Sequence, residues 1–406
     1  LDMAVCLGVF IVSLGSLAAS VFAEQPPSLS LLPPPMQNAS YDHGAHAKNS
    51  TWIAQTYHHA ALSGHEEEHG TASRLAAVKE EFAWSWKAYE DFAFGHDELR
   101  PVTQGFRDWG DSPLGLTILD NLDSLVIIGF SDEFTRALAW VNSTLSFDVD
   151  VEVSTFEMTI RALGGLLSAH ALTKESILLS QATDLGNRLL RAFDTPTGLP
   201  AAKVNLRTGP VRPRPTEMLV LSEVGTLSLE FIALSDATGD PRYRNAVDAT
   251  ATRLAKLATA VPERQLPPIL MSPADGQPVL GSMASLGAGG DSYYEYLLKA
   301  WLQTGKAETK RRQRYAVAAQ AIVRKMVKRT PRAGMAFLAE LSPFGGVHAK
   351  QDHLACFVPG MLALGAQTKA VKAADKHMAV ASELLETCGA LYTQTPTGLA
   401  AEISQF

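Results

Sequence analysis

A carboxylate and a guanidinium stand four positions apart in an otherwise apolar stretch of the chain, FEMTIRALGGLL. If the stretch is a helix, Glu157 and Arg161 lie on one face of it, and the surrounding apolar side chains predict that the rest of the helix is buried. A Glu four residues before a basic residue stabilises any helix, so the pair can be a structural ion pair. The alternative is a polar pocket at the helix start, where a carboxylate with a neighbouring Arg takes part in chemistry.

Further ionisable residues recur at the start of later apolar stretches. Glu223, Asp291 and His353 each precede a short turn that contains a threonine, as Glu157 does. The turn threonines are at positions 173, 238, 304 and 368, separated by 65, 66 and 64 residues. Each unit combines an apolar helix, a tight turn and a second, amphipathic helix, which predicts stacked helical hairpins.

This repeat predicts a polar rim. If the first helices of the units form the inner ring of a closed toroid, their starts converge at one end, where helix N-termini favour anions. Helix capping explains any single acidic residue at such a place, but it explains the recurrence less well.

Several carboxylates around an apolar-walled cavity suit the hydrolysis of glycosidic bonds. One carboxylic acid protonates the leaving oxygen and another carboxylate activates water. The segment GLTILDNLDSL adds Asp120 and Asp123, and GGDSYYEYLLKAW places Glu295 one helical turn after Asp291. The two tyrosines between Asp291 and Glu295 can stack on a sugar ring or pack in the core.

The composition excludes some classes of partner. The chain has 406 residues, 46% of them apolar and 19% charged, and a formal net charge of −7. This acidic balance, without a Lys/Arg-rich run, argues against nucleic acid and against an anionic membrane surface as partners. A neutral or mildly polar substrate fits the charge better.

The N-terminal part of the chain predicts a secretory address. Residues 1–23 contain a long uncharged stretch that can span a bilayer, and the small residues at its end resemble a signal-peptidase site. We therefore expect a signal peptide or a signal anchor there, and a missing true N-terminus, because the chain begins with Leu1 rather than Met. Asn-x-Ser/Thr triplets at Asn38, Asn49 and Asn142 agree with a luminal address.

The rest of the chain divides by composition. Residues 24–71 are rich in Pro and His and predict a disordered stem, whereas residues 72–406 predict the helical domain. Cys6 lies in the apolar leader, which leaves Cys356 and Cys388 as a pair. In an oxidising lumen a single disulfide is the simplest interpretation, and two unpaired buried thiols are the alternative.

Five segments in this order resemble class I α-1,2-mannosidases, glycoside hydrolase family 47, over roughly Leu75 to Phe406. They are AFGHDELRPV, GLTILDNLDSLVIIG, FEMTIRALGGLLSAH, GGDSYYEYLLKAW and QDHLACFVPGMLALG. The resemblance implies an all-α (α/α)7 barrel and inverting removal of α-1,2-linked mannose from high-mannose N-glycans. It also implies a calcium ion at the floor of the cavity, and an address in the endoplasmic reticulum or Golgi, as an anchored or a secreted protein.

The resemblance assigns roles position by position. Glu157 corresponds to the general acid, with Arg161 beside it, and Asp291 to a second catalytic carboxylate. The matches to cavity residues that contact substrate are Arg161, Glu223, Glu295, His353, Asp120 and Asp123. Cys356 and Cys388 match the family's disulfide, which favours a processing mannosidase over a degradation-enhancing, lectin-like relative.

Three departures from the family pattern affect these expectations. Gly289 stands where family members carry an Arg that selects among mannose branches, and the loop before Glu223 differs. The family's R-P-E-T-x-E-S motif, which bears the general base, and its calcium-holding Thr do not occur in these 406 residues.

From the repeat we expect about five of seven hairpins and a chain that ends, at Phe406, before its sixth. From the missing base we expect little or no activity of this chain. The alternative from another class is a non-catalytic, mannose-glycan-binding protein of the secretory pathway.

Overall fold

The structure is a computed structural model and describes residues 71–214 and 216–406. The expected leader at 1–23, the stem up to residue 70 and the triplets at Asn38 and Asn49 lie outside the described residues. Within the described part, no helix has the length and apolar character that crossing a bilayer requires.

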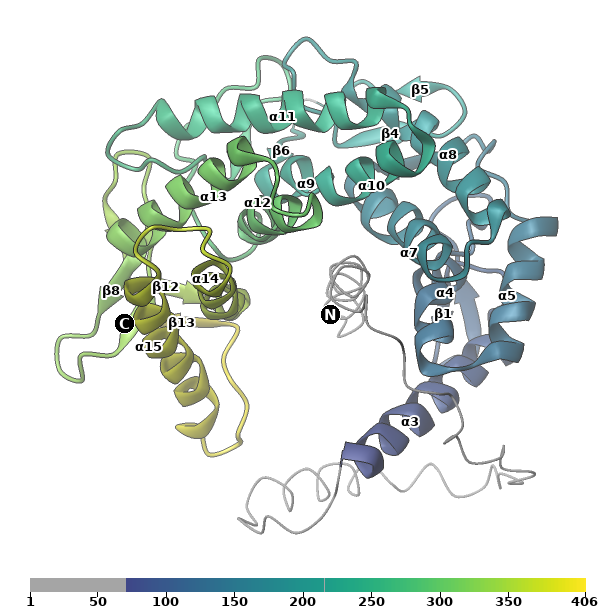
Figure 1. Cartoon of the computed structure of the whole chain (residues 1–406), viewed down its shortest axis with the longest axis horizontal. Helices are drawn as coiled ribbons and strands as arrows, with labels where there is room; N and C mark the ends of the chain where they lie inside the picture. Colours follow the sequence, from purple (N-terminus) through teal and green to yellow (C-terminus); the bar gives the residue numbers. More distant parts are fainter. Residues whose placement is uncertain (1–70, 215) are drawn as a thin grey trace.

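The described residues form five helical hairpins that follow one another around an arc (Figure 1). In each hairpin one helix lies on the inner side of the arc and the next returns on the outer side. The inner helices are α4 (Leu116–Ile128), α7 (Gly164–Thr173), α10 (Ser228–Thr238), α12 (Asp291–Gln303) and α14 (Val358–Gln367). The outer helices are α5 (Ser131–Ser143), α8 (Ser176–Leu190), α11 (Pro241–Thr259), α13 (Thr309–Ala321) and α15 (Ala374–Thr393).

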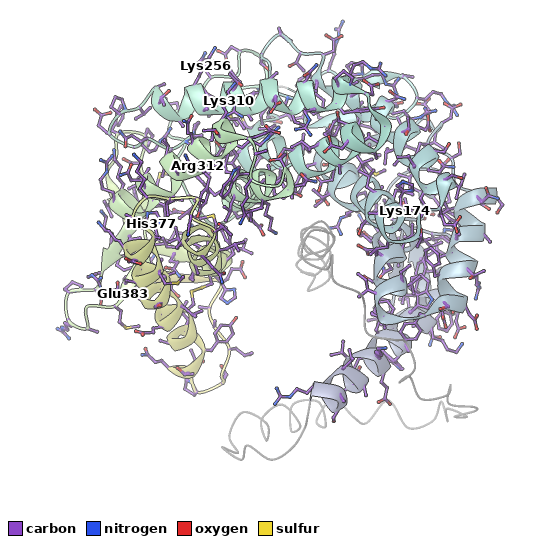
Figure 2. The ribbon with its side chains drawn as sticks, in the orientation of Figure 1. Lys174, Lys256, Lys310, Arg312, His377 and Glu383 are labelled. Carbon is purple, nitrogen blue, oxygen red and sulfur yellow. A yellow bond between two sulfur atoms is a disulfide. The ribbon has the colours of Figure 1, made fainter. Side chains whose placement is uncertain are left out.

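The two layers differ in side-chain pattern because they differ in surroundings. Inner helix α7 is apolar almost all round, and all of its residues from Gly164 to Ala169 are buried. Outer helix α8 buries one stripe, made by Leu178, Ala182, Leu185 and Leu189. The outer surface of the arc carries charged side chains, such as Lys256 on α11 and Glu383 on α15 (Figure 2).

The predicted turn threonines all lie at the ends of inner helices. Each hydroxyl donates to a carbonyl oxygen three or four residues earlier, at 2.6–3.0 Å. The residue after each threonine has a left-handed backbone, which reverses the chain towards the outer helix. These residues are Lys174 (φ 64°), Gly239 (75°), Gly305 (62°) and Lys369 (60°). The sequence repeat is therefore a repeat of structure, and the predicted all-α class is confirmed.

Short strands and short helices lie before the inner helices. Strand β3 (Glu152–Ser154) leads into α6 (Thr155–Glu157) and the π-helix η2 (Met158–Leu163). Strand β6 (Leu219–Val220) leads into α9 (Leu221–Gly225), and β12 (Lys350–Asp352) leads into η5 (His353–Phe357). All three strands have antiparallel partners, which fix where the helices after them begin.

The remaining elements are short apart from α3 (Thr71–Phe92). The other strands are β1 (Glu98–Arg100), β2 (Gly105–Arg107), β4 (Lys203–Asn205), β5 (Gly209–Pro210), β7 (Leu270–Met271), β8 (Val327–Arg329), β9 (Ala336–Leu338), β10 (Glu340–Leu341), β11 (Val347–His348) and β13 (Ile403–Gln405). Two short helical turns follow outer helices, η3 (Arg191–Phe193) after α8 and η4 (Ile322–Met326) after α13.

The repeated TPTGL segments adopt the same turn. Thr195 donates through its hydroxyl to the carbonyl of Leu199 at 2.5 Å, and Thr395 donates to the carbonyl of Leu399 at 2.9 Å. Each turn then leads to a strand, β4 or β13, that pairs with the strand before an inner helix.

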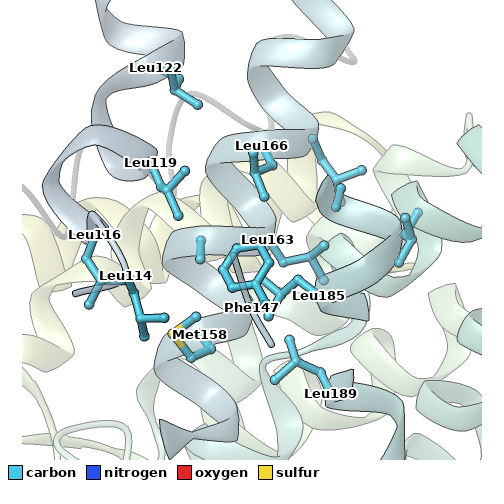
Figure 3. Close-up of a cluster of buried hydrophobic side chains, with 14 of the residues drawn as sticks. Leu114, Leu116, Leu119, Leu122, Phe147, Met158, Leu163, Leu166, Leu185 and Leu189 are labelled. Carbon is cyan, nitrogen blue, oxygen red and sulfur yellow. The ribbon is translucent and has the colours of Figure 1, made fainter. Parts of the chain in front are cut away.

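The buried apolar side chains form two core clusters. The first core cluster joins the helices from α3 to α12, and includes Leu119, Leu163, Leu185 and Phe231. Figure 3 shows its centre, where Leu119 and Leu166 lie between neighbouring helices. The second core cluster joins α11 to α15, and includes Leu257, Leu298, Ile322 and Leu362.

Inner helices α4 and α7 approach so closely that a glycine is needed between them. A Cβ on Gly165 would stand 2.0 Å from the carbonyl oxygen of Leu119, which is backbone and cannot swing away. This contact sets the separation between α4, which carries Asp120, and α7, which continues directly from the π-helix η2 (Met158–Leu163) that carries Arg161.

We predict that Gly165→Ala destabilises the domain by about 1–3 kcal/mol, because the added methyl forces α4 and α7 apart. The matched control is Gly389→Ala in α15, where a Cβ meets nothing within 4 Å. The control is expected to stabilise by about 0.5–1 kcal/mol, because alanine has the higher helix propensity. Urea unfolding followed by circular dichroism measures both. Equal effects of the two changes would contradict a tight α4–α7 contact.

Candidate active site

The charge pair that the sequence singles out lies at the entrance to an inner helix. Glu157 is the last residue of α6, and the hydroxyl of Ser154 accepts a hydrogen bond from its N–H at 3.2 Å. Arg161 lies in the π-helix η2, where the backbone departs from regular α geometry. Such irregular turns inside helices are common at functional sites.

Arg161 joins two carboxylates from neighbouring inner helices. Its Nε donates to Oε2 of Glu157 at 2.7 Å, and its Nη1 donates to Oδ2 of Asp120 on α4 at 3.2 Å. The guanidinium also lies over the ring of Trp109, 5.9 Å from its centroid. Side-chain exposures of 21% for Arg161, 32% for Glu157 and 34% for Asp120 show that a bound molecule can reach all three.

The pKa of Asp120 is shifted by its burial and by the charged groups around it. Burial raises its pKa to about 6, and the negative charges of Asp123 and Glu157 act in the same direction. Arg161 opposes the rise through its charge and its hydrogen bond. Asp120 is therefore a carboxyl group that changes protonation in the mildly acidic range.

The position of α4 depends on a buried carboxylate in the HDEL segment. Asp97 is 1% exposed, and its Oδ1 accepts from the N–H groups of Leu114 at 2.7 Å and Leu116 at 3.2 Å. Its Oδ2 accepts from the N–H of Trp109 at 2.9 Å. Asp97 thus satisfies N–H groups at the start of α4, and fixes Trp109 beside the helix that carries Asp120.

Glu223 lies between the first acidic group, which consists of Glu157 and Asp120, and the next segment of the rim. It lies on α9, and its pKa is raised by burial and then by the charges of Glu157 and Glu217. The N–H of its neighbour Ser222 donates to the carbonyl of Gly289 at 2.9 Å. This bond joins α9 to the loop that leads into Asp291.

A second acidic group surrounds the start of α12. Asp291 is the first residue of that helix, and burial, followed by the charges of Glu295 and Asp352, raises its pKa. Asp291 Oδ1 accepts a hydrogen bond from the N–H of Ser292 at 2.8 Å, and this bond opposes the rise in the pKa. Glu295 pairs with the buried Lys299 at 2.5 Å.

Asp352 extends this group to the last inner helix. Its Oδ2 accepts from the N–H of Ala288 at 3.2 Å, and Lys350 pairs with its Oδ1 at 3.0 Å and with Glu340 at 3.2 Å. His353 follows directly, and its Nε2 lies 2.5 Å from the hydroxyl of Tyr392. The acidic residues of successive inner helices thus follow one another around one end of the arc.

The disulfide expected near this end is confirmed. Cys356 in η5 and Cys388 in α15 are joined, with their Cα atoms 5.9 Å apart. The side chain of Gln351 lies against both sulfur atoms, with its Nε2 3.7 Å and 3.9 Å from them. The bond ties the segment that carries His353 to the outer helix behind it.

Not every residue singled out by sequence joins the rim. Asp123 is 3% exposed, and its Oδ2 accepts from the hydroxyl of Ser168 at 2.6 Å. It links α4 to α7 one turn below Asp120. Tyr293 and Tyr294 are 6% and 1% exposed and belong to the second core cluster, so core packing, and not sugar stacking, describes their environment.

Sequence reasoning missed three residues of this region. Asp352 had an available signal, because it directly precedes His353 in the segment QDHLACF. Trp109 has none, because its place under Arg161 depends on the fold of the loop before α4. Glu230 also had a signal, because it is a lone acidic residue on an otherwise apolar helix, where such a residue is unusual.

Glu230 lies between three inner helices, below the rim. It is 4% exposed, its Oε1 accepts from the hydroxyl of Tyr296 at 2.7 Å, and its Oε2 has no hydrogen-bond partner among the described residues. Burial raises its pKa to about 7, and the Tyr296 hydrogen bond and the charge of Lys299 only partly oppose this. Near neutral pH this carboxyl group therefore holds a proton for part of the time.

We predict that Glu230 makes the domain less stable as pH rises from about 4.5 to 7. In that range the unfolded chain releases the proton while the folded chain retains it, so the free energy of unfolding falls by up to about 3 kcal/mol. Glu230→Gln removes this contribution, and its stability relative to wild type should improve with pH over this interval. Urea unfolding at pH 4.5, 6 and 8 tests this, with the exposed Glu81→Gln as control. A pH-independent difference between Glu230→Gln and wild type would contradict it.

The resemblance implies a calcium ion, which proteins hold through oxygen ligands such as carboxylates. Between residues 71 and 214 and from 216 onward, no group of three or more His, Cys, Asp or Glu side chains is arranged to hold a metal ion. No step of the mechanism proposed for this protein passes through a metal.

Comparison with known proteins identifies the class. The sequence profile of the family described as glycosyl hydrolase family 47 matches residues 81–406. The chain is 41% identical over 334 residues to the endoplasmic reticulum mannosyl-oligosaccharide 1,2-alpha-mannosidase of Homo sapiens, covering 82% of this chain and 47% of that protein. It is 41% identical over 337 residues to a mannosyl-oligosaccharide 1,2-alpha-mannosidase of Arabidopsis thaliana, covering 81% of this chain and 58% of that protein.

A solved structure supports the same class. The alpha-1,2-mannosidase from Trichoderma reesei matches with a TM-score of 0.72 and 30% sequence identity, covering 82% of this chain and 70% of that one. The fold is therefore that of the (α/α)7 barrel mannosidases. The chain belongs to glycosyl hydrolase family 47. It spans about half the length of the curated relatives it matches.

Proposed function

We propose that this protein removes terminal α-1,2-linked mannose from high-mannose N-glycans. The observation that carries the proposal is the bridge from Arg161 to Glu157 and Asp120 at the entrance of an inner helix. It holds a partly exposed carboxyl group in a fixed orientation on a rim of further carboxylates. Membership of family 47 and the mannosidase names of the relatives support the substrate class.

In this proposal Glu157 is the general acid. Arg161 occupies Oε2, whereas Oε1 accepts no hydrogen bond within the described part of the chain, so Oε1 is the oxygen that carries the proton. The proton passes to the glycosidic oxygen as the bond from C1 to that oxygen breaks, and the shortened glycan leaves as an alcohol. Water attacks C1 from the opposite face and gives its proton to a carboxylate base, with inversion at C1.

Asp291 is the second catalytic carboxylate in this scheme. Its charge, when ionised, stabilises the positive charge that develops on the sugar ring as the bond breaks. Arg161, Glu223, Glu295, Asp120 and His353 remain proposed substrate-binding residues. Asp123, buried and bonded to Ser168, instead holds α4 against α7. Asp120, Glu223 and Glu295 have the better support, because each lies beside a proposed catalytic group.

The setting proposed for this reaction is the lumen of the secretory pathway, in the endoplasmic reticulum or Golgi. The Cys356–Cys388 disulfide supports an oxidising compartment, as do the names of the endoplasmic reticulum relatives. Calcium remains a proposed cofactor through family membership alone. The protein is released if the proposed leader at residues 1–23 is cleaved as a signal peptide, and it is anchored if the leader is retained in the membrane.

The acid side of this mechanism can be tested on the 406-residue chain itself. Because the family's base motif does not occur in it, we expect little release of mannose in water. Azide attacks C1 without needing a base, so added azide should restore cleavage of an α-1,2-mannobiose, giving β-mannosyl azide and free mannose. Glu157→Gln should lower the rate of this azide reaction by about 10²- to 10⁴-fold. Proton NMR of the anomeric hydrogens measures both product and stereochemistry.

The controls separate the alternatives. The exposed Glu175→Gln, at the turn before α8, should leave the azide reaction unchanged. Equal rates for Glu157→Gln and wild type would exclude Glu157 as the acid, and an α-mannosyl azide would exclude inversion. Glycan binding by wild type without any azide product would instead favour the non-catalytic, glycan-binding alternative. Brisk release of mannose in plain water would show that the chain supplies its own base.

A further inference from the structure

One exposed triplet of the described chain has the form of an acceptor for covalent modification. Residues 142–144 read Asn-Ser-Thr, the Asn-x-Ser/Thr pattern to which oligosaccharides are attached in the secretory pathway. We propose that Asn142 carries an N-linked oligosaccharide. The proposal requires entry into the lumen, but it does not require that the protein acts on glycans.

The triplet is fully on the surface. Asn142, Ser143 and Thr144 are all exposed, whereas Val141 and Leu145 on either side of them are 0% and 7% exposed. Val141 and Leu145 thus hold the chain to the core, while the side chain of Asn142 is exposed to solvent. A glycan attached there would extend into solvent without displacing any apolar contact.

The asparagine lies at the end of an outward-facing stripe of α5. Thr135 and Ala139 precede it on the exposed side of the helix. The helix ends at Ser143, and the N–H of Thr144 donates to the carbonyl of Trp140 at 2.9 Å. The hydroxyl-bearing third residue of the triplet therefore lies just beyond the helix, in irregular backbone.

The asparagine amide is not used by the fold. No hydrogen bond to the Asn142 side chain is found in the part of the chain that the structure describes, although the neighbouring Ser143 hydroxyl bonds the carbonyl of Ala139 at 2.8 Å. By comparison, the Asn205 side chain donates to Asp150 at 2.8 Å and accepts from the N–H of Arg207 at 3.0 Å. Replacement of an amide proton at Asn142 by a sugar consequently breaks no contact in the folded domain.

The chemistry is a group transfer whose co-reactant is a lipid-linked oligosaccharide diphosphate of the luminal membrane. The Nδ2 atom of Asn142 attacks C1 of the first sugar. The bond from C1 to the phosphate oxygen breaks, the lipid diphosphate leaves, and one amide proton is lost as the C1–Nδ2 bond forms. Because the triplet must be extended to enter the transferase, transfer takes place on the emerging chain, before the last turn of α5 has formed.

The position keeps the glycan away from the carboxylates. Only residues 144–151 separate the end of α5 from β3, which leads into α6 and Glu157. Asn142 is thus at the same end of the arc as the acidic rim, but on the outer layer of helices. The glycan would cover the outside of this end and leave the concave side of the inner helices open.

The test expresses the 406-residue chain behind an added cleavable signal peptide in eukaryotic cells. Chains with the Cys356–Cys388 disulfide are selected first, so that every molecule analysed has passed through an oxidising lumen. Enzymatic removal of glycans in ¹⁸O water converts a modified Asn to labelled Asp. We expect this label at Asn142 in most chains by peptide mass spectrometry.

The matched variants are Thr144→Val and Thr144→Ser. Valine has the shape of threonine without its hydroxyl, so Thr144→Val should remove the label from Asn142, while Thr144→Ser should retain it. Unlabelled Asn142 in wild-type chains that carry the disulfide would overturn the proposal. Label that persists in Thr144→Val would also overturn it, because the signal would then not depend on the acceptor triplet.

Discussion

The bridge from Arg161 to two carboxylates is the interaction on which the rest of the site depends. It joins Glu157, at the start of one inner helix, to Asp120 on the neighbouring one. The bond to Glu157 lies within one helical segment, whereas the bond to Asp120 exists only while the two helices stay close, and the backbone contact at Gly165 provides that closeness. Since a partly buried charge is costly without its partner, the geometry of the site and the packing of the helices support each other.

The rim concentrates negative charge where helix starts converge. Helix N-termini carry positive partial charge and so reduce the repulsion between neighbouring carboxylates. Three basic side chains share the remaining compensation, since Arg161 pairs with Glu157 and Asp120, Lys299 with Glu295, and Lys350 with Asp352. An excess of carboxylates over nearby cations is suited to a transition state in which a sugar ring becomes positively charged.

The sequence predicted the parts of the structure that repeat. The threonine spacing located the ends of four inner helices, and counting back from them located Glu157, Glu223, Asp291 and His353 at or near the starts of the same units. These predictions succeeded because the period reflects packing of one hairpin against the next. The helical class and the disulfide followed from equally local signals.

What the sequence could not give is contact between segments far apart in the chain. The place of Trp109 under Arg161 depends on the loop that Asp97 holds. The burial of Asp123 and of the tyrosines after Asp291 depends on which side of each helix faces a neighbour. The spacing of Asp120 and Asp123 allows two arrangements, one with both residues at the rim and one with Asp123 below it. The close approach of α7, which places Ser168 beside Asp123, selects the second arrangement.

The division of the core has a consequence for how the protein tolerates change. The first and second core clusters are separate sets of side chains, and α11 and α12 contribute to both. Leu122 and Leu163 belong to the same cluster, so the effects of substitutions at the two positions should interact. A change at Leu122 and one at Leu257 affect different sets, and the two energies should simply add. Substitutions in the first core cluster and in the second are therefore tolerated nearly independently of each other, provided that α11 and α12, which contribute to both clusters, are preserved.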